Sequence, residues 1–219
     1  MKKFFLILIA VLLPAASAVA ENTLHLGAYL PLSFLSVDNS SVNLKGAGAS
    51  FDFTHVAERG FTWKAGAGAA VITTDDIFTY DNGKCRGVDL NLEFGFGYSF
   101  LHDEELTLSL LGTFGLRGQS AIRECDYYDS VLGVKFASTE SSYSNALFFI
   151  GPEFSLTYRL TRHLGIFGNF GLFFATGSSD LEIKIVGPAD TEYNGKNSDE
   201  NLSSIGLILQ PKLGFSLTF

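Results

Sequence analysis

A set of charged and amide side chains occupies alternate positions within apolar segments spread along the chain. Both signs of charge are present, and such groups are stable away from water only when they are paired and hydrogen-bonded. Two kinds of chemistry follow: a paired polar network that fills an interior, or a narrow path along which ions pass. The set consists of Asp52, Lys64, Asp89, Glu93, Arg117, Glu153, Gln210 and Lys212.

The two cysteines, Cys85 and Cys125, flank a pair of consecutive segments that alternate apolar and polar residues. We expect these segments to be hairpin partners, so the two thiols come near each other at one rim, and disulfides persist in exported chains. A Cys85–Cys125 disulfide is therefore predicted. Counting the register across the turn at 101–105 leaves the thiols several residues out of opposition, so a loop would have to fold back.

Metal and cofactor chemistry has no support in the sequence. There is no CxxC motif and no cluster of cysteine and histidine that would suggest zinc. Asp75–Asp76 and Asp199–Glu200 are simple pairs and lack the spacing of a calcium-binding loop. We predict no metal site and no cofactor.

Residues 1–20 have the pattern of a secretion signal. Lys2 and Lys3 precede an apolar run from Phe4 to Leu13 that is too short to span a bilayer, and small residues before Glu21 suit cleavage. An uncleaved anchor is disfavoured by that length. Removing the two lysines leaves 13 basic and 23 acidic residues, so the formal net charge falls from -8 to -10. An acidic, exported chain of residues 21–219 argues against nucleic acid as a partner.

The dominant period of the mature chain is two, which indicates β-strands. The clearest case runs from Val88 to Phe100, where apolar residues at even positions alternate with polar residues and glycine. No later apolar run is long enough for a membrane-spanning helix. The pattern predicts one domain with strands over 23–36, 43–57, 61–73, 88–100, 106–118, 146–158, 164–176 and 204–219.

The connections between these strands alternate in length. Three are short, and four are longer, two of them much longer; short periplasmic turns with long outer loops are typical of outer-membrane barrels. The short connections are 58–60, 101–105 and 159–163. The longer ones are 36–41, 74–87, 119–145 and 177–203.

The volume of the interior decides which face points outward. An eight-stranded barrel has room only for the side chains that fill it. The apolar face carries leucine, isoleucine and many phenylalanines from all eight strands, which cannot fit inside, whereas the opposite face is rich in glycine, serine and threonine. We therefore predict an all-β, eight-stranded antiparallel up-and-down transmembrane β-barrel with its apolar face toward lipid.

Aromatic residues and the last strand agree with this orientation. Residues of the outward face that lie beside the short turns are aromatic, as the interfacial belt of a membrane protein requires. They are Phe61, Trp63, Tyr98, Phe100 and Tyr158.

The chain ends in an alternating apolar strand that contains Phe215, Leu217 and Phe219. This ending resembles the C-terminal insertion signal of bacterial outer-membrane barrels. With the architecture of the whole mature chain, it makes the protein similar to the small eight-stranded barrels of the OmpA, OmpX and OmpW type, without assigning a subfamily. The resemblance implies insertion by the outer-membrane assembly machinery, contact with outer-membrane lipid, and location in a Gram-negative-type envelope. The peptidoglycan-binding domain that the OmpA type appends is not expected.

Catalysis is not expected. Outer-membrane acyl hydrolases and omptin-like proteases place a histidine with serine or aspartate near the outer rim. Here His102 and His163 fall in short turns, and His25 and His55 fall near the same end. No histidine can therefore act as a general base at the outer rim.

Two functions of different classes remain. The segments 119–145 and 177–203 carry an excess of acidic residues, together with tyrosines of the kind found in binding surfaces. A rigid barrel that presents these segments to an extracellular ligand is one hypothesis, although acidic loops also serve only to keep a surface soluble. The alternative is a narrow or lateral channel for small solutes, hydrophobic ones included, with Phe149, Phe167 and Phe173 lining or plugging it.

Overall fold

The computed structural model describes residues 21–38, 40–74, 84–128, 135–186 and 192–219, and the regular structure in them is β-strand. Among these residues, no helix has the length and apolar character needed to cross a membrane. The predicted signal peptide, residues 1–20, lies outside the described residues and stays a prediction. The strands are β1 (Glu21–Tyr29), β2 (Leu32–Val37), β3 (Ser40–Val56), β4 (Phe61–Thr74), β5 (Lys84–His102), β6 (Leu106–Tyr128), β7 (Lys135–Arg159), β8 (Leu164–Val186) and β9 (Glu192–Thr218).

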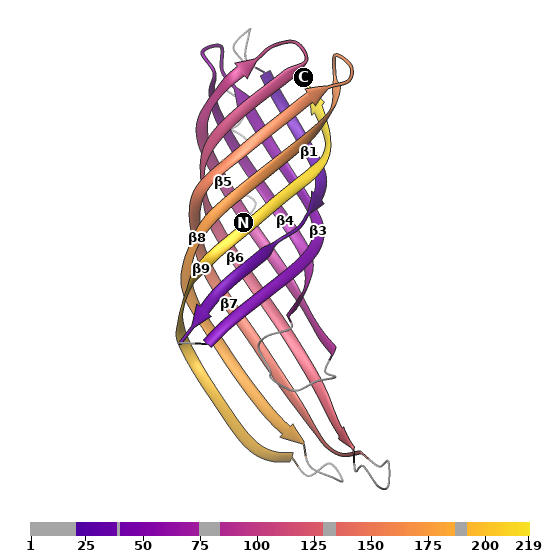
Figure 1. The fold of residues 1–219 in the computed structure, drawn as a ribbon, viewed down its shortest axis with the longest axis vertical. Coiled ribbons are helices and arrows are strands. Elements are labelled where there is room, and N and C mark those ends of the chain that lie inside the picture. The colour runs from indigo at the N-terminus through magenta and orange to yellow at the C-terminus, as the bar shows by residue number, and fades with distance from the viewer. Residues whose placement is uncertain (1–20, 39, 75–83, 129–134, 187–191) are drawn as a thin grey trace, which may run out of the picture.

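The strands form one closed antiparallel sheet (Figure 1). From β3 onward each strand pairs with the next along the chain, and β9 pairs with both β1 and β2. Because β1 and β2 both lie between β3 and β9, they occupy a single position in the ring. The predicted fold class, an eight-stranded antiparallel up-and-down barrel, is confirmed.

Proline explains why the first barrel strand is divided in two. The sequence predicts one strand over 23–36, but the structure interrupts it at Leu30 and Pro31. Pro31 has no backbone N–H to donate to the ladder. The wall is nevertheless continuous, because the Leu30 N–H donates to the Pro211 carbonyl at 3.1 Å and the Pro31 carbonyl accepts from Gly46 at 3.0 Å.

The two faces of the wall differ as predicted. On β5, Leu90 is 59% exposed on the outside, while its neighbour Asp89 is fully buried inside. The same alternation holds around the ring, so leucine and phenylalanine side chains form an outer apolar belt and polar side chains fill the lumen. In water such an exterior would expose far more contiguous apolar surface than soluble proteins show, whereas lipid accommodates it.

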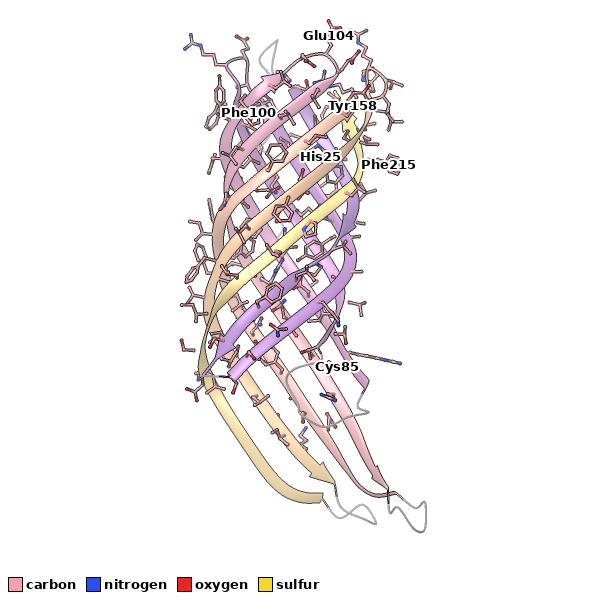
Figure 2. The ribbon with its side chains drawn as sticks, viewed as in Figure 1. His25, Cys85, Phe100, Glu104, Tyr158 and Phe215 are labelled. Atoms are coloured by element: carbon pink, nitrogen blue, oxygen red, sulfur yellow. The ribbon has the colours of Figure 1, made fainter. Side chains whose placement is uncertain are left out.

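Short turns join β3 to β4, β5 to β6, and β7 to β8 at one end of the barrel. The first and last strands also meet there, since Thr23 is opposite Thr218. Figure 2 shows Phe100 and Tyr158 close to this end, below the turn that carries Glu104. Both rings are exposed on the outer face, in the position expected for an interfacial aromatic belt.

The turn after β5 is stabilised by a carboxylate. Asp103 accepts backbone hydrogen bonds from Leu106 at 2.7 Å and Glu105 at 3.0 Å, and these bonds hold the pKa of its carboxyl below the ordinary value of 3.8. A carboxyl whose pKa is lower in the folded state stabilises that state above the unfolded pKa, and the contribution is lost as the pH falls through the folded pKa. We expect an NMR titration to place the Asp103 pKa below 3.8. Titration at or above that value would show that the turn does not hold the carboxylate.

The segments predicted as the two longest loops, 119–145 and 177–203, are instead mostly paired strand. β6 continues to Tyr128 and β7 begins at Lys135, while β8 continues to Val186 and β9 begins at Glu192. Loop prediction was wrong for these residues because their outward side chains become polar where the strands leave the apolar belt, and the alternation that marked a strand is lost. The β6–β7 pairing nevertheless continues from Gln119 to Tyr127, where the register shifts, and the β7–β8 pairing continues from Leu147 to Ser138.

These extensions form a four-stranded sheet that projects beyond the rest of the barrel, at the bottom of the view in Figure 1. We call it the projecting sheet, and it consists of residues 120–128, 135–144, 178–186 and 192–203. The opposite wall, made of β1 to β5, is shorter. The barrel therefore has an asymmetric rim at the end opposite the short turns.

Candidate functional site in the lumen and at the rim

Five charged side chains from five strands form a continuous chain of ion pairs across the lumen. Lys64 on β4 donates to Glu153 Oε1 and Oε2 at 2.5 Å each and to Glu93 Oε1 at 2.7 Å. Lys212 on β9 also donates to Glu93, and it reaches Asp52 Oδ1 at 2.8 Å. Every member of this chain is buried. Each carboxylate therefore has a cationic partner in a place where an unpaired charge would be costly.

A second group is centred on Arg117. Its Nε lies 3.4 Å from Asp89 Oδ2, its Nη2 donates to Gln210 Oε1 at 2.5 Å, and it also donates to the Tyr29 hydroxyl. Tyr29 in turn donates to Asp89 Oδ1 at 2.7 Å. Gln210 Nε2 donates to Glu93 Oε2 at 2.6 Å and so joins the two groups.

The structure thus brings all eight predicted lumen residues into one hydrogen-bonded network. It contains three cations, Lys64, Lys212 and Arg117, and four carboxylates, from Asp52, Asp89, Glu93 and Glu153. The arrangement is that of a paired polar network in the interior, which is one of the two kinds of chemistry that the residue types allowed.

Three more side chains, Gln119, Tyr143 and Asn145, extend this network toward the projecting sheet, and they were not predicted because the sequence pattern placed them in a loop. Gln119 Nε2 donates to Asp89 Oδ2 at 2.7 Å, and Asn145 Nδ2 donates to Gln119 Oε1 at 2.8 Å. Asn145 also donates to the Tyr143 hydroxyl at 3.0 Å. Inward-facing side chains alternate along β6, so the next inward position after Arg117 is Gln119. That alternation could have predicted Gln119 as a lumen residue.

An apolar cluster fills the lumen beside this network, toward the projecting sheet. Phe149 and Phe173 are fully buried there, with ring centroids 5.0 Å apart, and the Arg117 guanidinium lies 5.6 Å from the centre of the Phe149 ring. Leu181 and Leu202 of the projecting sheet pack against the cluster. The cluster comprises Leu35, Val37, Val42, Leu44, Ile72, Tyr143, Leu147, Phe149, Phe173, Ala175 and Ile208.

The Phe173 ring needs a glycine beside it. A Cβ at Gly171 would lie 2.2 and 2.4 Å from two atoms of the ring. We expect Gly171→Ala to lower the free energy of unfolding by about 1–3 kcal/mol through overpacking, measured by urea unfolding in lipid vesicles. Gly168→Ala, on the same strand but with only Leu213 nearby at 3.9 Å, is the control and should be neutral. Equal effects of the two variants would show that the lumen is not tightly packed at Phe173.

The histidines lie where the sequence placed them along the barrel. His25 is buried in the lumen, stacked on Phe167 with centroids 4.5 Å apart, and its Nε2 lies 3.3 Å from Thr157 Oγ1. His55 contacts Asn22 at 2.9 Å, and His102 and His163 belong to the end with the short turns. Among the described residues no group of histidine, cysteine, aspartate and glutamate is arranged to hold a metal ion. The expectation that the protein is not an enzyme stays a prediction.

The predicted disulfide is only partly within the described residues. Cys85 is half-buried and has no disulfide partner among the described side chains, and the side chain of Cys125 lies outside them. The backbone register pairs Cys85 with Arg123, so Cys125 is two residues away along β6 rather than several. The Cys85–Cys125 disulfide stays a prediction.

Comparison with known proteins supports the fold. No family model matches the sequence, and no curated protein matches it either. A major outer-membrane protein from Thermus thermophilus has a similar solved structure, with a TM-score of 0.54, 13% identity, and coverage of 92% of this chain and 100% of that one.

Two further solved structures are similar at lower scores. The attachment invasion locus protein Ail of Yersinia pestis has a TM-score of 0.47 and 10% identity, covering 91% of this chain and 99% of that one. The outer-membrane protein OprG of Pseudomonas aeruginosa has a TM-score of 0.42 and 11% identity, covering 91% and 96%. With the apolar belt and the closed ring, the similarity to the Thermus protein gives this chain the fold of a small outer-membrane β-barrel.

Proposed function

We propose that the protein resides in the outer membrane of a Gram-negative-type bacterium and holds the projecting sheet at the cell surface as an adhesin-like platform for an extracellular partner. The observation that carries the proposal is strand length. The strands β6 to β9 have 23, 25, 23 and 27 residues, whereas about 9–11 residues are enough to cross a bilayer. The surplus continues the barrel ladder into water.

Surface chemistry supports contact with a soluble partner. Among the described side chains on the outward face of the projecting sheet, Glu140, Asp180 and Lys184 are exposed, together with one apolar side chain, Ile122. The ladder keeps these groups in fixed positions, which reduces the ordering cost of binding relative to a flexible loop. This surface takes over the role that the sequence assigned to segments 119–145 and 177–203.

Export and insertion form part of the same proposal. The signal peptide at 1–20 would direct the chain across the inner membrane and be cleaved before Glu21. On the closing strand, Phe215, Leu217 and Phe219 all point outward and are exposed to lipid. That row is accessible to the outer-membrane assembly machinery as its insertion signal.

The alternative, a narrow channel or transporter for small solutes, hydrophobic ones included, has less support. In the described part of the chain, the paired network crosses the lumen and the apolar cluster lies beside it. The interior of an eight-stranded barrel is just wide enough to be filled by side chains or to hold one small ligand.

Shortening the β6–β7 and β8–β9 hairpins tests whether the projecting sheet is the adhesin-like platform. The pairs Arg123–Ser141 and Glu182–Ser198 lie directly opposite each other, so an Asn-Gly turn can replace 124–140 and 183–197. The trimmed barrel keeps Tyr143, Leu181 and Leu202 and should remain heat-modifiable on gels. We expect cells that display the full-length protein to adhere to surfaces coated with matrix proteins, and the trimmed protein to lose that adhesion.

Conductance distinguishes the two functions. If the protein is a platform, the ion conductance of planar bilayers that contain the purified protein should equal that of the bare membrane. Unchanged adhesion after trimming, together with conductance well above background, would replace the platform with the channel.

A further inference from the structure

Among the described residues, the paired network in the lumen carries more negative charge than positive charge. A surplus charge in a buried interior is costly unless something neutralises it. The next inward cation along β6, Arg123, belongs to the projecting sheet rather than to the network. The network consists of four carboxylates, from Asp52, Asp89, Glu93 and Glu153, and three cations, Lys64, Lys212 and Arg117.

The nearby histidine has no contact with a carboxylate that would stabilise its charged form. His25 Nε2 lies 3.3 Å from Thr157 Oγ1, and His25 Nδ1 has no hydrogen-bond partner. Asp52 is directly opposite His25 in the β1–β3 ladder, but its carboxylate is bound by Lys212 instead. An imidazolium at this position would therefore be a further buried charge without an ion-pair partner.

Two oxygen atoms without a hydrogen-bond partner flank a glycine beside the network. Ser50 on β3 and Asn91 on β5 are directly opposite Gly68 of β4, one on either side. Both residues are only 3% exposed, and neither Ser50 Oγ nor Asn91 Oδ1 has a hydrogen-bond partner. A Cβ at Gly68 would lie 2.3 Å from Asn91 Oδ1, so this oxygen lies over the glycine. Buried polar atoms without a partner are rare and point to a bound water or ion.

The nitrogen of the Asn91 amide determines which way its oxygen points. Asn91 Nδ2 donates to Glu93 Oε2 at 3.2 Å, so the carbonyl oxygen faces away from the carboxylate and toward Gly68. A carbonyl oxygen only accepts, and the hydroxyl oxygen of Ser50 has lone pairs as well. The two atoms are therefore suited to a positively charged species between them.

The surplus negative charge lies next to these two oxygens. Asp52 and Glu93 flank Gly66 as Ser50 and Asn91 flank Gly68, and a Cβ at Gly66 would lie 1.9 Å from Asp52 Oδ1 and 3.1 Å from Glu93 Oε1. Among the described residues, Asp52 shares its cation, Lys212, with Glu93. The two glycines are about 7 Å apart along the strand. An ion above Gly68 is thus close to the carboxylate whose charge is least compensated.

We propose that the lumen binds one metal cation of single charge, with sodium as its probe, above Gly68. Asn91 Oδ1 and Ser50 Oγ contact the ion, Asp52 supplies the neighbouring negative charge, and water completes the coordination. Carbonyl oxygens replace the hydration shell of a monovalent cation in ion-selective filters in the same way. One positive charge makes the network neutral, whereas a divalent ion would leave a surplus of the opposite sign. The prediction of no metal site rested on zinc and calcium motifs, which this site does not use.

The stability of the purified barrel in vesicles tests the site. Urea titrations at constant pH and ionic strength are repeated while sodium chloride is exchanged stepwise for N-methylglucamine chloride, whose cation is too large for the site. The fluorescence of Trp63 reports unfolding. An ion that binds only the folded state lowers the unfolding equilibrium constant about tenfold for each tenfold rise in its concentration above the Kd. We expect this dependence for the wild type.

Three variants locate the ion. Ser50→Ala removes one ligand and should raise the Kd for sodium about tenfold. Asp52→Asn removes the surplus charge and should abolish the dependence on sodium. Ser216→Ala is the control, because Ser216 Oγ is another buried hydroxyl without a partner but lies on β9 opposite His25. This control should respond to sodium like the wild type.

Sodium NMR gives a second readout that does not require unfolding. The folded wild type should broaden the sodium signal, and Asp52→Asn should not. An unfolding constant of the wild type that depends on pH but not on sodium would show that a proton neutralises the network, and this result would overturn the proposal. A response to calcium alone, or an equal change in Ser50→Ala and Ser216→Ala, would also overturn it. The measurements use no cells and no protein partner, so their outcome is independent of the adhesin-like role.

Discussion

Lys64→Met should destabilise the barrel by about 3–5 kcal/mol, because removing one partner leaves a buried carboxylate unpaired. Lys64 is the cation bound by both Glu153 oxygens, and it shares Glu93 with Lys212. Without it, the partner that Glu153 keeps among the described residues is the Thr113 hydroxyl at 3.2 Å. The free energy of unfolding can be measured by urea titration in vesicles, followed by the fluorescence of Trp63, the single tryptophan.

A double variant separates lost charge pairing from lost packing. In Lys64→Met/Glu153→Gln the unpaired charge is gone, while Glu93 still pairs with Lys212, so most of the stability should return. Lys184→Met, which removes a lysine whose side chain is 53% exposed and 3.4 Å from Glu182, should change stability by less than about 1 kcal/mol. If Lys64→Met is no worse than Lys184→Met, the network does not hold the lumen together.

The second large effect is expected on the outer face. Leu92 lies near the middle of the apolar row from Val88 to Phe100 and is 63% exposed. An arginine there must enter the hydrocarbon region, which costs about 2–4 kcal/mol near the midplane of a transmembrane barrel. We expect Leu92→Arg to lower the free energy of unfolding in vesicles by that amount.

The same substitution beyond the belt provides the control. Ser144 is exposed on the outward face of β7, where that strand enters the projecting sheet. Ser144→Arg should change stability by less than about 0.5 kcal/mol, because the new charge stays in water. A similar small effect for Leu92→Arg would mean that its surroundings are aqueous, and the transmembrane assignment would fail.

Both predictions depend on a feature that could be anticipated without coordinates. Strict alternation in segments such as Val88–Phe100 defines two faces, and the limited interior volume of an eight-stranded barrel determines which face points outward. The residues of the inward phase, including Lys64 and Glu153, could therefore be placed in the lumen before their partners were known.

The alternation of apolar and polar residues predicted strands less well outside the membrane-spanning part of the barrel. Beyond Gly118 on β6 and before Ala146 on β7 both faces carry polar residues, so strand and loop look alike in sequence. Hydrogen bonds to neighbouring strands, such as the pairing of Gln119 with Asn145, extend the ladder there whatever the hydropathy. Pairing is a property of two segments together, and a pattern within one segment does not contain it.

The sequence alone determined the period, the number of barrel positions and the lipid-facing side, because these depend on local alternation and on volume. Only the tertiary structure decided which cation meets which carboxylate and how far β6 to β9 extend past the membrane. Those outcomes depend on the relative shift of neighbouring strands. A shift of two residues keeps every side chain on its face but changes all of its partners.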